Sequence, residues 1–119
     1  MKTQTNNRVC EFRLKLSSYA NLYFIKRALK LEAALKKKPR VLCVEMIGDG
    51  EIPADTALLI RSILLQRPPG TELVTHARSS LQGGSVLVWL LGDRRFIRDD
   101  ARVFFKHNPL ADEDPVDVY

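Results

Sequence analysis

The sequence predicts an α/β domain with a mainly parallel sheet and helices packed on it. Residues 9–16 alternate between polar and apolar side chains, which is typical of a strand with one buried face. Residues 19–38 repeat apolar side chains at helical spacing, and residues 40–47 form a short apolar run that indicates a buried strand. Because strand and helix patterns keep alternating, consecutive strands are expected to lie parallel, joined by crossover helices.

The first strand and the first helix carry boundary signals. The polar face of residues 9–16 places this strand at a sheet edge, or leaves one of its sides open. Ser17 and Ser18 suit the N-cap of the helix, and Pro39 ends it because proline lacks the N–H that a helix interior needs. The predicted buried stripe of this helix comprises Leu22, Ile25, Ala28, Leu29 and Leu35.

The later elements continue the alternation. Residues 40–47 are expected to be a central strand, and residues 54–66 a second helix that follows Pro53. The predicted buried face of that helix comprises Ala57, Leu58, Ile63 and Leu64. The remaining predicted elements are a strand at 71–77, an all-round buried helix at 85–91, and short strands at 95–97 and 102–105.

Length and charge indicate one domain with an acidic tail. The 119 residues are 45% hydrophobic and 28% charged, which suits one globular domain that we place at residues 1–107. The net charge is +5, yet residues 108–119 contain four acidic residues and no Lys or Arg. We therefore expect a basic domain followed by a flexible acidic tail.

The sequence offers little for metal, cofactor or membrane chemistry. His76 and His107 are the only histidines, and no Cys/His cluster has zinc spacing, so neither a metal nor a cofactor is predicted. Cys10 and Cys43 lie among apolar residues and are interpreted as small buried hydrophobes. No secretory signal is visible, and the apolar run at 86–91 is too short to span a bilayer. A cytoplasmic location without a membrane partner is expected.

Basic residues gather along and after the first helix, at Lys26, Lys30, Lys36, Lys37 and Lys38. They make nucleic acid a possible partner, because phosphates attract such clusters. A solvated surface is the favoured interpretation, since no aromatic residues are interleaved on the polar face and no nucleic-acid-binding motif accompanies the lysines.

Two glycine turns are candidate ligand sites. Gly48 and Gly50 follow a predicted strand, where ligands bind in open α/β sheets. Gly83 and Gly84 precede the short helix. The turn at Gly48 and Gly50 lacks the fuller glycine-lysine pattern of a phosphate loop, so a plain tight turn is the favoured interpretation there. Gly83 and Gly84 could supply one backbone N–H of the kind that holds a thioester oxygen in crotonase-type enzymes.

Residues 41–109 carry a series of short motifs in a fixed order. A strand and a glycine turn lead to a helix that ends in a Pro-Pro stop, and the next strand leads into a serine turn before a buried helix. The motifs are Arg67-Pro68-Pro69, Ser79-Ser80-Leu81-Gln82-Gly83, Arg95-Phe96 and the strand end Lys106-His107-Asn108-Pro109. In order and spacing they resemble the Clp protease proteolytic subunit, within the ClpP/crotonase-like superfamily. The resemblance implies a minimal ClpP/crotonase-like domain of the ββα type.

This resemblance also implies which residues of this sequence stand at the family's catalytic positions. The family's nucleophilic serine falls on Leu81, and its general-base histidine falls on Lys106, with His107 one place late. The segment that carries the family's triad aspartate is absent from this sequence. The weak remaining candidates are Ser80 with Lys106, which would resemble the serine–lysine dyad of signal-peptide peptidases, and His107.

The expected function is that of a catalytically inactive ClpP-like binding, scaffold or regulatory module, with a protein partner or self-association. One alternative is a residual serine hydrolase or peptidase, and another is a crotonase-type acyl-CoA enzyme. Two roles without catalysis also stay open: a basic nucleic-acid-binding module, and a small α/β domain similar to anti-sigma-factor antagonists.

Overall fold

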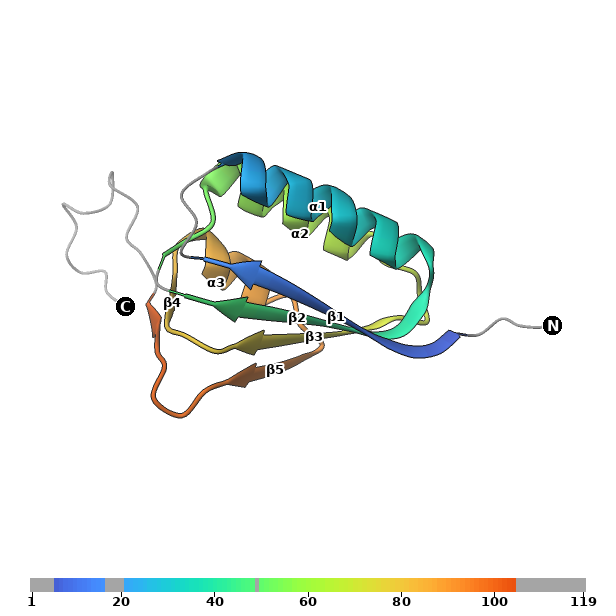
Figure 1. Ribbon diagram of the computed structural model, residues 1–119. Coiled ribbons are helices and arrows are strands. Elements are labelled where there is room, and N and C mark those ends of the chain that lie inside the picture. The colour runs from blue at the N-terminus through green and yellow to red at the C-terminus, as the bar shows by residue number, and fades with distance from the viewer. Residues whose placement is uncertain (1–5, 17–20, 49, 105–119) are drawn as a thin grey trace.

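The computed structural model describes residues 6–16, 21–48 and 50–104. In chain order the elements are β1 (Asn6–Lys15), α1 (Asn21–Lys36), β2 (Pro39–Ile47), α2 (Ala54–Leu65), β3 (Glu72–Ala77), β4 (Leu81–Gln82), α3 (Gly84–Trp89), β5 (Arg94–Ile97) and β6 (Val103–Phe104). The strand pairs among them are parallel, which confirms the predicted α/β class (Figure 1). Ser17, Ser18, Lys106, His107 and residues 108–119 lie outside the described residues.

The larger sheet has the strand order β1-β2-β3-β5, with β1 at one edge and β2 inside, as predicted. Its register places Phe12 beside Val44 and Val44 beside Thr75. Because the strands run in one direction, the carboxyl ends of β2 and β3 meet at the same edge of the sheet. The glycine turn and the serine turn therefore lie next to each other.

A second sheet consists of β4 and β6. Leu81 pairs with Val103, and Gln82 pairs with Phe104. β6 falls inside the predicted strand at residues 102–105. The sequence pattern does not predict β4, because a two-residue strand is too short to show a period.

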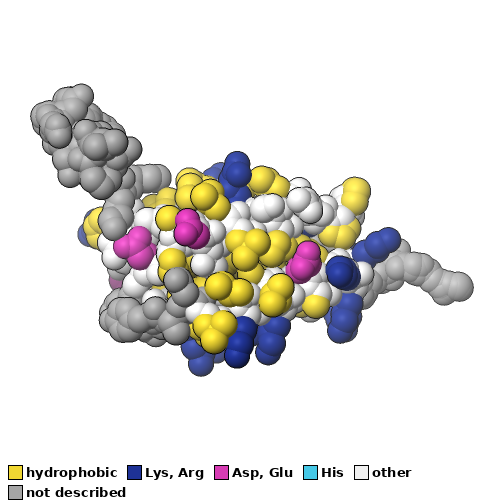
Figure 2. Space-filling view, turned by 90° about the horizontal axis from the view of Figure 1, so that it is seen from above, with side chains coloured by type: hydrophobic (Ala, Val, Ile, Leu, Met, Phe, Trp, Pro, Cys, Tyr) yellow, Lys and Arg dark blue, Asp and Glu magenta, His cyan; other side chains and the backbone are white. Residues whose placement is uncertain are grey.

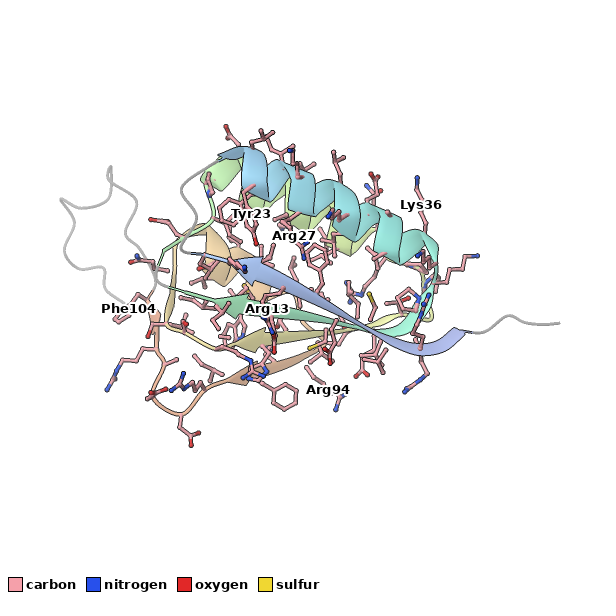
Figure 3. All side chains as sticks on the ribbon, in the orientation of Figure 1. Arg13, Tyr23, Arg27, Lys36, Arg94 and Phe104 are labelled. Atoms are coloured by element: carbon pink, nitrogen blue, oxygen red, sulfur yellow. The ribbon has the colours of Figure 1, made fainter. Side chains whose placement is uncertain are left out.

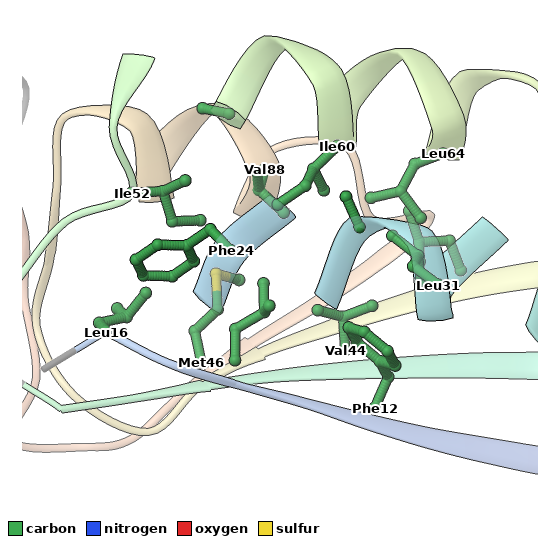
Figure 4. Packing of buried hydrophobic residues seen from close by; sticks show 14 of the residues in the cluster. Phe12, Leu16, Phe24, Leu31, Val44, Met46, Ile52, Ile60, Leu64 and Val88 are labelled. Atoms are coloured by element: carbon green, nitrogen blue, oxygen red, sulfur yellow. The ribbon is translucent and has the colours of Figure 1, made fainter. Parts of the chain in front are cut away.

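The helices pack on one face of the larger sheet. α1 and α2 lie side by side across it, and α3 packs against α2 (Figure 1). The core fills the space between this helical layer and the sheet (Figure 4). Its largest fully buried side chains include Leu14, Leu16, Phe24, Leu31, Leu42, Met46, Ile52, Ile60, Leu64, Leu73 and Leu81.

The predicted buried stripe of α1 is wrong at three positions. Leu22, Ile25 and Leu29 are 58%, 40% and 59% exposed. α1 carries two apolar stripes, and the one with the aromatic ring faces the sheet. The face that is buried comprises Phe24, Ala28, Leu31 and Leu35.

Two further burial predictions are corrected. On α2, Ala57 and Leu64 are buried as predicted, whereas Leu58 is 53% exposed. α3 is not buried all round, since Leu87 and Leu90 are 43% and 41% exposed. This helix lies at the margin of the helical layer, so one of its sides faces outward.

The opposite face of the sheet carries no described helix. A row of ion pairs crosses it instead, because Glu45 on β2 accepts from Arg13 on β1 at 3.1 Å and from Arg78 after β3 at 2.7 Å. Arg94 on β5 pairs with Glu72 on β3 at 2.8 Å (Figure 3). The long stems of such side chains cover apolar surface while their charged heads stay in water.

Candidate functional site

The serine turn after β3 is bonded to the glycine turn after β2. The backbone N–H of Gly48 donates to Ser79 Oγ at 2.9 Å. One residue earlier, the N–H of Arg78 donates to the carbonyl oxygen of Met46 at 2.8 Å. Two of the turns singled out in the sequence therefore form one structure at the carboxyl edge of the sheet.

Ser80 joins the same turn to the segment before β6. Its Oγ accepts the backbone N–H of Arg102 at 2.9 Å, and the carbonyl oxygen of Arg102 accepts the N–H of Leu81 at 2.8 Å. Ser79 and Ser80 thus both act as acceptors for backbone groups, as short polar side chains in turns commonly do. The other half of the Ser80–Lys106 pair, and His107, lie outside the described residues.

Leu81 is fully buried, with 0% of its surface exposed. It belongs to the core cluster together with Val86 and Val88 of α3. A saturated hydrocarbon side chain has no nucleophilic atom and no proton to exchange. The centre of the serine turn is therefore a packing position.

The glycines of the two turns have separate roles. Gly48 and Gly83 have φ angles of 108° and 60°, in the left-handed region that favours glycine. Gly84 has a different constraint, because a Cβ at this position would meet the carbonyl oxygen of Ile52 and lie 2.9 Å from the Cβ of Ala57. Gly84 lets α3 approach α2, so the space beside its Cα is filled by protein.

A side-chain hydroxyl at the start of α3 also forms hydrogen bonds with the backbone of the preceding turn. Ser85 is buried, and its Oγ donates to the carbonyl oxygen of Gln82 at 2.7 Å and accepts the N–H of Gln82 at 3.1 Å. These bonds pair polar groups that would otherwise be costly to bury. The hydroxyls of the turn are thus placed to stabilise its backbone.

Asp93 joins the start of β3 to the segment that follows α2. Its Oδ2 accepts the N–H of Leu73 at 2.8 Å, and its Oδ1 pairs with Arg67 at 2.8 Å. The bond from Leu73 and the charge of Arg67 hold the pKa of Asp93 below its ordinary value, against the effect of partial burial. Neither contact was visible in the sequence, because each joins distant segments.

Two other titratable groups lie on the open sheet face. Burial acts to raise the pKa of Glu45, but hydrogen bonds from Arg78 and Arg13 outweigh it and leave this pKa lowered. Burial and the nearby carboxylates of Glu45 and Glu11 raise the pKa of the Cys43 thiol. A thiol with a raised pKa is a poor nucleophile at neutral pH. Cys10 and Cys43 are free and half-buried, so they are less enclosed than predicted.

The five lysines of the predicted basic cluster do not converge on one pocket, since Lys36 and Lys38 line a groove between α1 and α2 whereas Lys37 lines a separate groove beside β1. Lys26 and Lys30 lie on the outside of α1, and Lys36, Lys37 and Lys38 follow at its end, all exposed. His76 lies on the open sheet face, edge-on to the ring of Phe96 at 6.2 Å. Within residues 6–16, 21–48 and 50–104, no group of three or more His, Cys, Asp or Glu side chains is placed to hold a metal. In the same ranges no helix is long and apolar enough to cross a membrane.

Comparison with known proteins found no match for this chain. Neither protein-family models, nor curated proteins, nor solved structures gave a match. The resemblance noted in the sequence therefore stays a hypothesis, which depends on the residues of the turns.

Proposed function

We propose that this chain is a catalytically inactive ClpP/crotonase-like domain that works as a binding or scaffold module. The observation that carries this proposal is the complete burial of Leu81. In the register of the resemblance, this residue takes the place of the nucleophilic serine. Ser79 and Ser80, the neighbouring hydroxyls, both accept backbone N–H groups.

A crotonase-type activity has weak support at the second glycine turn. Such chemistry requires backbone N–H groups that face an open pocket and hold a thioester oxygen. Gly84 instead packs against Ile52 and Ala57. The close contact at Gly84 favours a role for this turn in packing α3 onto α2, and not in holding a ligand.

The experiment compares the wild-type chain with the double variant S79A/S80A. Hydrolysis is measured with a p-nitrophenyl ester and a fluorogenic peptide, and acyl-CoA binding is measured by calorimetry. We expect wild type and variant to give the same background hydrolysis and no acyl-CoA heat. Turnover that the double variant loses, or saturable acyl-CoA binding, would overturn the proposal.

A further inference from the structure

The carboxyl-terminal half of β1 has its outer edge capped by side chains of α1. The backbone N–H of Lys15 donates to the hydroxyl of Tyr23 at 2.9 Å, and Nη2 of Arg27 donates to the carbonyl oxygen of Arg13 at 2.9 Å (Figure 3). The guanidinium carbon of Arg27 also lies 4.1 Å from the centre of the Phe12 ring. Backbone groups that an edge strand would present to solvent are therefore satisfied here within the chain.

The amino-terminal half of the same edge lacks such caps. Lys15 and Arg13 direct their backbone groups outward, whereas Leu16 donates to a carbonyl oxygen of β2 at 2.7 Å. Because alternate residues of a strand face the same side, Glu11 and Val9 also direct their N–H and C=O groups outward. In the part of the chain that the structure describes, no bond to these four groups is found. A row of donors and acceptors at strand spacing is thus left open to solvent.

The other edge of the larger sheet is shorter and is also capped. β5 has four residues, and the carbonyl oxygen of Phe96 accepts the indole N–H of Trp89 at 3.0 Å. Figure 2 looks onto the helical layer and shows hydrophobic side chains along it. Helix backbone groups pair within the helix, so that layer presents side chains instead of a row of backbone donors and acceptors. Of the two edges of the larger sheet, β1 therefore offers the longer row of open backbone groups.

Two hollows flank the open stretch of β1. One has a volume of about 270 Å³ and is lined by Val9, Cys10 and Ala34 among others. The other has a volume of about 280 Å³ and is lined by Glu11 and Arg27 among others. Ala34 lies two turns beyond Arg27 on the same side of α1. Where Arg27 reaches out to the strand, Ala34 presents only a methyl group, so the space beside Cys10 stays open.

Charged side chains differ between the two sides of this edge. Arg8 and Lys37 line the hollow beside α1, and no described carboxylate lines it with them. On the open sheet face Glu11 is exposed, while the other carboxylate near the edge, Glu45, is paired with Arg13. An added strand is therefore matched by an acidic side chain towards α1 and by basic side chains over the open sheet face.

We infer that a partner protein extends the larger sheet at this edge, by placing an extended segment against Val9 and Glu11. A row of N–H and C=O groups at strand spacing is complemented by another extended chain. The side chain of that segment opposite Cys10 enters the hollow beside Ala34 and is acidic, and its two neighbours over the open sheet face are basic. The inference rests on the proposed binding role and names the kind of segment that is bound.

The probe is the peptide TVKEKVT, blocked at both ends, which reads the same in both directions and carries the basic-acidic-basic triplet at its centre. Its control is TVEKEVT, in which the three charges are exchanged. We expect TVKEKVT to bind the whole chain with a Kd of about 0.1–1 mM, because few backbone bonds are made. TVEKEVT should bind about tenfold more weakly, although its net charge is opposite to the +5 of the chain.

Amide hydrogen exchange of the wild-type chain shows which backbone groups the peptide binds. Val9 and Glu11 should exchange quickly in the free chain and more slowly with TVKEKVT, whereas the amide of Lys15 should be protected in both. Val9→Pro removes an outward N–H without breaking a bond to β2, so it should weaken binding about tenfold with unchanged circular dichroism. Val9→Thr is the matched control, because it keeps the N–H and should bind as wild type does.

Three results would overturn the inference: no binding of TVKEKVT at about 5 mM, equal binding of the two peptides, or equal binding by Val9→Pro and wild type. Protection of Glu11 that rises with protein concentration in the absence of peptide would also overturn it, because a second copy would then occupy the edge. A peptide that fails to bind leaves the hydrolysis measurement of the proposed function unchanged. Hydrolysis that depends on Ser79 or Ser80 would contradict the binding role while leaving the peptide measurement as it stands.

Discussion

The Oγ of Ser79 accepts the backbone N–H of Gly48 at 2.9 Å, and this bond joins the turns that follow β2 and β3. We expect Ser79→Ala to lower the free energy of unfolding by about 1 kcal/mol, because the N–H of Gly48 loses its partner. Chemical denaturation measures the change. Ser62→Ala, at an exposed position on α2, is the control and should change stability by less than about 0.5 kcal/mol. Equal effects of the two variants would show that the bond contributes nothing specific.

Placing a hydroxyl at the centre of the serine turn should damage the fold without creating activity. Leu81→Ser places a polar group at a position with 0% exposure, so we expect a loss of about 3 kcal/mol or more. Leu87→Ser on α3, 43% exposed in wild type, should cost less than about 1 kcal/mol. A stable Leu81→Ser protein that hydrolyses an ester would argue against the packing role of this residue.

Because α3 lies in close contact with α2 at Gly84, alanine substitution should affect stability differently at Gly84 and at Gly70. Gly84→Ala should destabilise the domain by about 2 kcal/mol, because the new Cβ meets the backbone of Ile52. Gly70→Ala is the matched control, since no atom lies within 4 Å of the position that its Cβ would take. It should be neutral or slightly stabilising. Thermal unfolding of the two variants measures the difference, and comparable melting temperatures would contradict the contact.

Asp93 should make stability depend on acid pH. Its pKa is lowered in the folded state, so its contribution is present above the ordinary pKa of 3.8 and is lost as the pH falls through the folded pKa. We expect the melting temperature of Asp93→Asn to fall less steeply with acidification than that of wild type. Arg67→Met removes only one of the two contacts and should give an intermediate slope. Parallel curves for all three proteins would refute this assignment.

Exposed lysines at the end of α1 should give at most weak, salt-sensitive binding to nucleic acid. If Lys36, Lys37 and Lys38 contact phosphates, the logarithm of affinity should fall with the logarithm of salt at a slope of about −3. The triple alanine variant should lose this binding, whereas Lys15→Ala on the open sheet face should keep it. Affinity that survives physiological salt would favour a nucleic-acid-binding module instead.

The order of the main elements could be predicted because each has its own period. Residues 9–16 alternate with period two, and residues 19–38 repeat with the period of a helix, so both predicted elements agree with the structure to within a few residues. The buried face of α1 could not be predicted in the same way. Leu22, Ile25 and Leu29 form one apolar stripe and the residues around Phe24 form another, and only tertiary packing selects between them.

For the candidate site, the sequence located the turns but not their bonds. The glycines and serines mark the turns through their backbone freedom and short polar side chains. The bonds from Gly48 to Ser79 and from Arg102 to Ser80 join residues far apart in the chain, and no local pattern encodes them. The same holds for Asp93, which precedes β5, because its partner Leu73 lies on β3, 20 residues earlier in the chain.

Whether the serine turn is chemically inert is measured most simply by the intact mass of the chain after treatment with a fluorophosphonate. This reagent reacts covalently with activated serine hydroxyls without requiring turnover. We expect the mass to be unchanged, because Leu81 occupies the centre of the turn and Ser80 accepts a backbone N–H. A stoichiometric mass increase that Ser80→Ala abolishes would contradict an inactive domain and would identify Ser80 as a nucleophile.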